Sequence, residues 1–177
     1  MRGETDRAKI ERFMQELGNR VRGPGSIYLT GGGTAVLEGW RGMTIGLDLK
    51  ALPEPPGLFE AIAQLKEIID LNVELASPDD FIPAVPGWRE RSLFIARCGT
   101  LDFYHYDPFA QALAKIERGH TRDLADVAAM LERRLIDRPR LWQLFESIAP
   151  ELLRYPGIEP AAFRASVLAI CRPSPSV

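Results

Sequence analysis

Apolar residues recur every three or four positions near the start of the chain. Ile10, Phe13, Leu17 and Val21 would share one face of a helix, and their spacing predicts a helix from residue 5 to about 21. Residues 58–69 show the same period. Short apolar runs predict strands at 26–30, 43–49, 71–75, 92–96 and 101–106, the last two forming a hairpin through 98–100.

The pattern changes near residue 107, after which only helices are predicted. Asp107 followed by Pro108 is a typical helix start, Thr121 and Asp137 are predicted to cap further helices, and Gly119 is predicted to separate two of them. We therefore expect an α/β (α+β) fold. Residues 1–106 would form a mixed sheet with flanking helices, and 107–177 a helical part packed with it as one unit.

Composition narrows the function classes only slightly. The chain has 177 residues, of which 46% are hydrophobic, so it can bury a core, and its net charge of −2 gives no global signature of nucleic-acid binding. No apolar run approaches the roughly 20 residues that span a bilayer. Cys98 and Cys171 have no metal-ligand spacing and are interpreted as free thiols. These features predict a cytoplasmic protein with no membrane partner.

The stretch from residue 30 to 49, TGGGTAVLEGWRGMTIGLDL, carries the candidate chemistry. Gly32, Gly33 and Thr34 follow a predicted strand and open a predicted helix, a position where backbone amides can approach phosphate. Asp48 lies on the next predicted strand. A tight turn that serves only helix entry is the structural alternative.

The order of these parts resembles the nucleotidyltransferase superfold, and within it the abortive-infection toxin-like branch. Gly32-Gly33-Thr34-Ala35 matches the branch's turn, and Arg41 and Thr44 match the approach to its Asp-x-Asp strand. The resemblance implies that the turn and Arg41 bind a nucleoside triphosphate and that Asp48 binds Mg²⁺. Gly46 stands where the first metal-binding aspartate belongs.

A second motif in the helical part extends the resemblance. Lys115 and Arg122-Asp123, on either side of the Gly119 break, resemble the branch's helical motifs. The resemblance implies that Lys115 neutralises the triphosphate and that Asp123 completes the site. The alternative is a solvated helix face with an Arg122–Asp126 pair.

Glu74, on the predicted strand 71–75, would take the place of the third carboxylate as base or metal ligand, or else face solvent without a role. Glycine is unfavourable within a strand, so we expect Gly46 to be the loss of an acid and not a structural requirement. Three interpretations stay open: nucleotide binding without turnover, activity with an unusual ligand set, or a substitution in this sequence.

The resemblance implies an NTP donor, Mg²⁺, and transfer to the hydroxyl of an RNA or protein. Related toxins act on tRNA ends and pair with a small antitoxin protein. The competing hypotheses are a catalytically impaired pseudo-nucleotidyltransferase that serves as a binding or interaction module, and a scaffold without ligand. The aromatic run around Tyr104 is interpreted as core or as a base-stacking platform, and His105 and His120 as groups that titrate near neutrality.

Overall fold

The computed structural model describes residues 3–172 and divides into two compact units, each described here by itself. The first unit joins the residues up to Ser77 to the hairpin segment Ser92–Tyr106. The second joins Pro78–Arg91 to the residues from Asp107 onward. The chain thus crosses between the units three times. Residues 78–91 belong to the unit that contains the helices after Asp107, whereas the sequence pattern had placed them before the division at residue 107.

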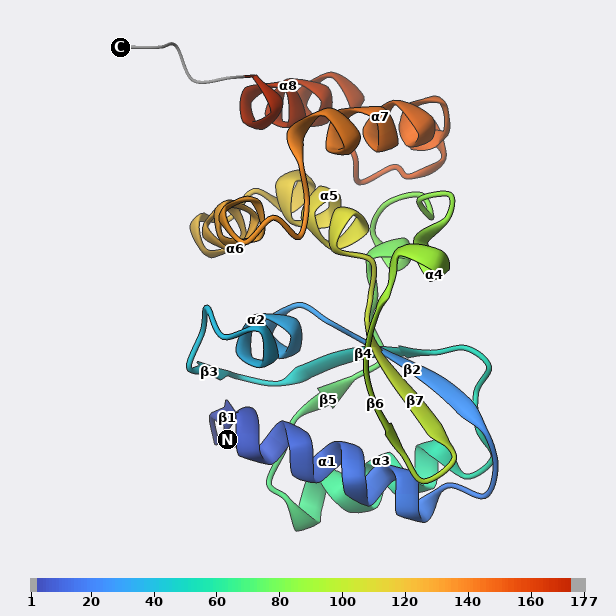
Figure 1. Cartoon of the computed structure of the whole chain (residues 1–177). Helices are drawn as coiled ribbons and strands as arrows, with labels where there is room; N and C mark the ends of the chain where they lie inside the picture. The colour runs from blue at the N-terminus through green and yellow to red at the C-terminus, as the bar shows by residue number, and fades with distance from the viewer. Residues whose placement is uncertain (1–2, 173–177) are drawn as a thin grey trace. The chain divides into compact units, whose positions relative to one another are not determined.

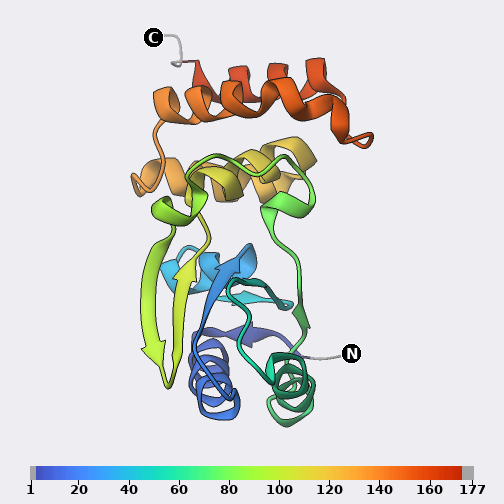
Figure 2. The same ribbon diagram turned by 90° about the vertical axis from the view of Figure 1, so that its right-hand side faces the viewer.

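A five-stranded mixed sheet forms the centre of the first unit (Figures 1 and 2). Its order is β5-β4-β2-β7-β6. The β2–β7 and β4–β5 pairs are parallel, whereas β2–β4 and β6–β7 are antiparallel. The strands are β2 (Gly25–Thr30), β4 (Leu47–Ala51), β5 (Val73–Glu74), β6 (Leu93–Cys98) and β7 (Leu101–His105). The predicted mixed α/β class is confirmed.

Helices α1 (Arg7–Arg20) and α3 (Leu58–Ile68) cover one face of this sheet (Figure 2). The apolar faces of both helices pack on the sheet, and every second residue of the strands points toward the helices. Because strand side chains alternate, the neighbours of these core residues point to the opposite face. The core residues include Phe13, Leu17, Ile27, Leu29, Leu47, Leu49, Leu65 and Phe103.

The predicted strand 43–49 is two strands in the structure. β3 (Met43–Thr44) leaves the main sheet and pairs with β1 (Thr5–Asp6), while β4 begins at Leu47. Ile45 and Gly46 form the bend between β3 and β4. The single-strand prediction is wrong here because the pairing with β1 redirects the chain.

The second unit contains five α-helices that Figure 1 labels: α4 (Trp88–Arg91), α5 (Pro108–Arg118), α6 (Thr121–Glu132), α7 (Arg138–Ile148) and α8 (Pro160–Cys171). Asp107 and Asp137 cap α5 and α7, accepting hydrogen bonds from the N–H groups of Phe109 and Arg140 as predicted. Gly119 ends α5 with φ of 71°. Thr121 is the first helical residue of α6 and not its cap, which is His120.

Two 3₁₀ segments, Pro78–Asp80 and Ala149–Arg154, also belong to this unit. Within residues 3–172, no helix combines the length and apolarity needed to cross a bilayer.

Candidate functional site

The glycine turn follows β2 directly and opens α2 (Gly32–Glu38). Gly31 has φ of 61° and ψ of −130°, a conformation that residues with a side chain rarely adopt. A Cβ on Gly32 would lie 2.0 Å from Thr44 Oγ1, and one on Gly33 would lie 3.0 Å from Leu47 Cδ2. The glycines therefore let the turn and α2 approach β3 and β4 closely.

Three segments that are distant in sequence meet beside this turn. Thr30, the last residue of β2, is the register partner of Asp48 on β4, and Asp48 is the partner of Glu74 on β5. Register partners on adjacent strands point to the same face. The Asp48 carboxylate reaches the turn itself, because its Oδ2 lies 3.0 Å from the position of a Cβ on Gly31. Asp48 is half-buried and Glu74 is exposed.

Gly46 packs against Asn72, the residue that precedes β5. A Cβ at position 46 would lie 3.1 Å from both Asn72 Cβ and the Asn72 carbonyl oxygen. That oxygen accepts the N–H of Leu47 at 2.9 Å, which fixes its position. Gly46 thus lies at the bend between β3 and β4 and not within a strand, and a side chain there would require Asn72 to shift by a few tenths of an ångström. The expectation that Gly46 marks the loss of an acid stays a prediction.

Asp48 and Glu74 could hold one Mg²⁺ ion only if a bound ligand and water supplied further oxygen atoms. Asp48 and Glu74 offer carboxylate oxygens on neighbouring strands, the donor type that Mg²⁺ prefers. Among residues 3–172 there is no group of three His, Cys, Asp or Glu side chains that could hold a metal ion. Phosphate oxygens and water would have to complete the coordination.

Arg41 follows the other end of α2. Its backbone N–H donates to the carbonyl of Ala35 at 3.2 Å, two residues after the C-cap Gly39. The backbone of Arg41 is therefore anchored at the end of α2 that lies away from the glycine turn.

Lys115 and Asp123 lie together in the second unit, in an ion-pair network between α5 and α6. Lys115 Nζ is 2.7 Å from Asp126 Oδ2 and 3.6 Å from Asp123 Oδ1, and all three side chains are buried. Arg118 Nε donates to Asp123 at 2.7 Å. Burial raises the pKa of Asp123, but the Arg118 hydrogen bond and charge, helped by Lys115, outweigh it and lower that pKa. Asp126 thus pairs with Lys115, a partner that sequence spacing did not suggest.

His105 joins the glycine turn to the sheet, a contact that the sequence did not predict. Its Nδ1 lies 3.2 Å from Thr34 Oγ1 and its Nε2 lies 3.1 Å from Glu38 Oε1. Burial, and then the charge of Arg7, lower the pKa of His105 to about 4. The expectation that His105 titrates near neutrality is therefore wrong.

Thr34 is consequently held within the fold. Its hydroxyl donates to the Leu29 carbonyl at 3.3 Å and contacts His105, and the residue is 1% exposed. The Thr34 hydroxyl is therefore committed to contacts within the fold. The one available signal for His105 was its place on β7, in alternation with the inward-facing Leu101 and Phe103.

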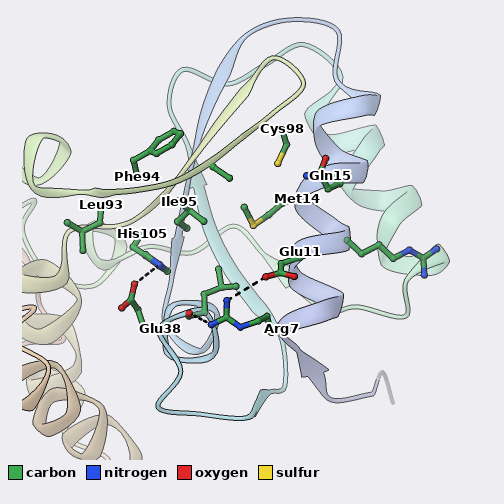
Figure 3. A pocket seen from close by; sticks show the side chains of 13 residues that line it. Arg7, Glu11, Met14, Gln15, Glu38, Leu93, Phe94, Ile95, Cys98 and His105 are labelled. Carbon is green, nitrogen blue, oxygen red and sulfur yellow. Dashed lines mark hydrogen bonds and ion pairs between the residues drawn. The ribbon is translucent and has the colours of Figure 1, made fainter.

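A pocket of about 690 Å³ lies between α1 and β6, with His105 at one end (Figure 3). Arg7, Glu11 and Arg12 of α1 and Glu38 of α2 supply its charges, and β6 supplies apolar side chains including Leu93 and Ile95. Arg7 also donates to the Leu37 carbonyl at the end of α2. The pocket therefore contains both charges and an apolar wall.

No family model, curated protein or solved structure matches this chain.

Proposed function

We propose that this protein binds a nucleoside triphosphate as its Mg²⁺ complex beside the glycine turn, in the manner of a nucleotidyltransferase. The proposal rests on the strand register. Thr30 at the end of β2 pairs with Asp48 on β4, and Asp48 pairs with Glu74 on β5, so both carboxylates lie on the strands next to the glycine turn. The acceptor of a transferred nucleotide would be a hydroxyl of RNA, with tRNA as one candidate, or of a protein. A small partner protein belongs to the same hypothesis.

Each residue has a defined part in this proposal. Backbone N–H groups from Gly32 to Thr34 would bind phosphate oxygens. Gly33 and Thr34 are buried, so the turn would have to open for the ligand to reach them. Asp48 and Glu74 orient the cation, which would supply charge neutralisation on the transferring phosphate. Arg41, Lys115 and Asp123 remain predicted contributors, and Lys115 would first have to leave its contacts with Asp126 and Asp123.

The alternative is a pseudo-nucleotidyltransferase that binds nucleotide or a partner protein without transfer, and Gly46 favours it. Among residues 3–172, no third histidine, cysteine or acid joins Asp48 and Glu74 in a group that could hold a metal ion, and Gly46 lies in tight contact with Asn72. Loss of a charge-stabilising group commonly reduces the rate by about a hundredfold or more. Binding is therefore expected to be easier to detect than transfer.

Thermal unfolding with each NTP, with and without Mg²⁺, tests the binding proposal. A ligand at about 100 times its dissociation constant stabilises the folded state by about 2.7 kcal/mol, which raises the melting temperature by about 5–10 °C. We expect an Mg²⁺-dependent shift that Asp48→Asn abolishes. Glu60→Gln, an exposed acid on α3, is the matched control and should leave the shift unchanged. Absence of any shift with all nucleotides would overturn the proposal.

Transfer is tested separately with α-labelled NTP and RNA or protein acceptors. Label on an acceptor, lost in Asp48→Asn, supports the enzyme, whereas a thermal shift without label supports the pseudo-enzyme. Gly46→Asp addresses the missing acid. We expect it to lower the melting temperature without ligand, because of Asn72, and to enlarge the shift produced by NTP with Mg²⁺. An unchanged or smaller shift would show that the missing acid does not limit binding.

A further inference from the structure

The sheet of the first unit ends in an open strand. β6 is the last strand in the order β5-β4-β2-β7-β6, and no strand among residues 3–172 pairs with its outer side. It is six residues long, whereas β5 at the opposite edge has two. A long edge strand presents unpaired N–H and C=O groups and is a template for pairing with another strand.

Two large apolar side chains of β6 are exposed. Phe94 is 61% exposed and Leu93 is 38% exposed. The positive charge on the strand, Arg97, is held in place by Asp102 on β7, with Nε 2.7 Å from Oδ1. The strand therefore exposes a large aromatic ring and a fixed guanidinium.

A β-bulge brings these two groups to the same face. Phe94 pairs with Tyr104 and Arg97 pairs with Asp102, and Tyr104 and Asp102 are two residues apart on β7. Residues two apart on a strand share a face. The irregularity lies between Phe94 and Ala96, so Phe94 and Arg97 share a face although they are three residues apart.

We propose that two copies of this chain pair through β6, antiparallel, about a two-fold axis between Ile95 and Ala96. This axis places Phe94 opposite Arg97 of the partner subunit. By symmetry, Arg97 also lies opposite Phe94 of the partner subunit. A guanidinium over an aromatic ring is a favourable pair, and its repetition on both sides is the self-complementarity that a two-fold interface requires. The occupant of the edge is thus a second copy, because β6 supplies both members of the pair.

The pocket beside α1 is lined by residues of the same strand, Phe94 among them. Leu93 and Ile95 line it, and β6 is the outermost strand, so the pocket borders the sheet edge (Figure 3). In the proposed register Leu93 of the partner subunit lies opposite Cys98, whose own side faces α1. The apolar wall of the pocket then receives side chains from the added strand.

Sedimentation equilibrium of the full chain tests the interface, at concentrations up to about 100 µM, where an interface with a micromolar dissociation constant is almost fully formed. We expect a dimer whose dissociation constant rises at least about tenfold in Phe94→Asp. The matched control is Phe59→Asp, on α3 and 53% exposed, which should dimerise like the parent chain. A monomer at every concentration, or a dimer indifferent to Phe94→Asp, overturns the proposal.

Disulfide trapping tests the register. Phe94→Cys and Arg97→Cys chains are mixed and oxidised, and the heterodimer that joins position 94 to position 97 should form faster than either homodimer. The parent chain measures the background from Cys98, which is buried, and from Cys171. Equal rates for the three products would contradict this register and with it the proposed interface.

Discussion

His105 shows how one buried residue can fix the position of a functional turn. Its ring lies between Thr34, in the glycine segment, and Glu38, at the end of the same helix. Both ends of α2 are thus tied to β7 by one side chain. Burial and the charge of Arg7 disfavour the imidazolium ion, so protonation of His105 opposes the folded state.

Stability should therefore depend on pH through His105. Its pKa falls from 6.5 to about 4 on folding, so the unfolded chain binds the proton more readily between these values. The free energy of unfolding is therefore unaffected by His105 above pH 6.5. It decreases as the pH falls from 6.5 to 4, by up to about 3 kcal/mol. Urea unfolding from pH 7 to 4 should show this loss.

His105→Gln removes the titrating group and should flatten the pH dependence in that window. His120→Asn, at an exposed position at the start of α6, is the control and should retain the slope of the parent chain. A His105→Gln chain with the parent's slope would contradict the assignment.

The candidate site was predictable only in part at the level of residues. The glycine turn, Asp48 and Glu74 could be named from their sequence pattern and its resemblance, and the strand register places them side by side. Asn72 and His105 could not be named, because their importance comes from packing against Gly46 and Thr34 across strands. The contact of Gly46 with Asn72 could not be foreseen either, since Asn72 is distant in sequence.

At the scale of elements, local signals were reliable and pairing was not. The periodic faces of α1 and α3 and the caps Asp107 and Asp137 follow from nearby residues, and the structure confirms them. The break between β3 and β4 depends on the pairing of Thr5 with Thr44. No local propensity at 43–49 encodes that distant partner.

The α5–α6 pair depends on buried charge, and Lys115 is its centre. Removing one member of a buried ion pair leaves the others without compensation, at a cost of about 3–5 kcal/mol. Lys115→Met leaves Asp123 and Asp126 buried with one cation fewer, so we expect a loss of about 3 kcal/mol in the free energy of unfolding.

Arg118→Met provides the comparison on the same network. Its side chain is 59% exposed, so the loss should be about 1 kcal/mol or less. Chemical denaturation of both variants measures the difference. If Lys115→Met were as stable as Arg118→Met, Lys115 would be free to serve another role, such as contact with phosphate.

At the scale of the whole molecule, the sequence pattern separates strands from helices but does not assign residues 78–91. This proline-rich segment precedes the hairpin, yet it belongs to the helical unit. Arg91 at its end explains the assignment, with Nε 3.0 Å and Nη2 2.7 Å from Asp107 Oδ2. Arg91 and Asp107 lie on either side of the hairpin in the sequence, and the hydrophobic pattern does not reveal a contact of this kind.

Residues 78–91 should therefore stabilise the helical unit. Asp107 is fully buried, and burial raises its pKa although Arg91 opposes this, so without Arg91 the carboxylate loses its compensating charge. A chain of residues 107–177 alone should unfold at lower urea than one in which 78–91 is joined to 107–177 by a Gly-Ser linker of about six residues. The joined chain carrying Arg91→Met tests the ion pair and should lose most of the gain. Equal stability of the two parent chains would show that the helices after Asp107 form a complete unit, and that the packing of 78–91 against them contributes little.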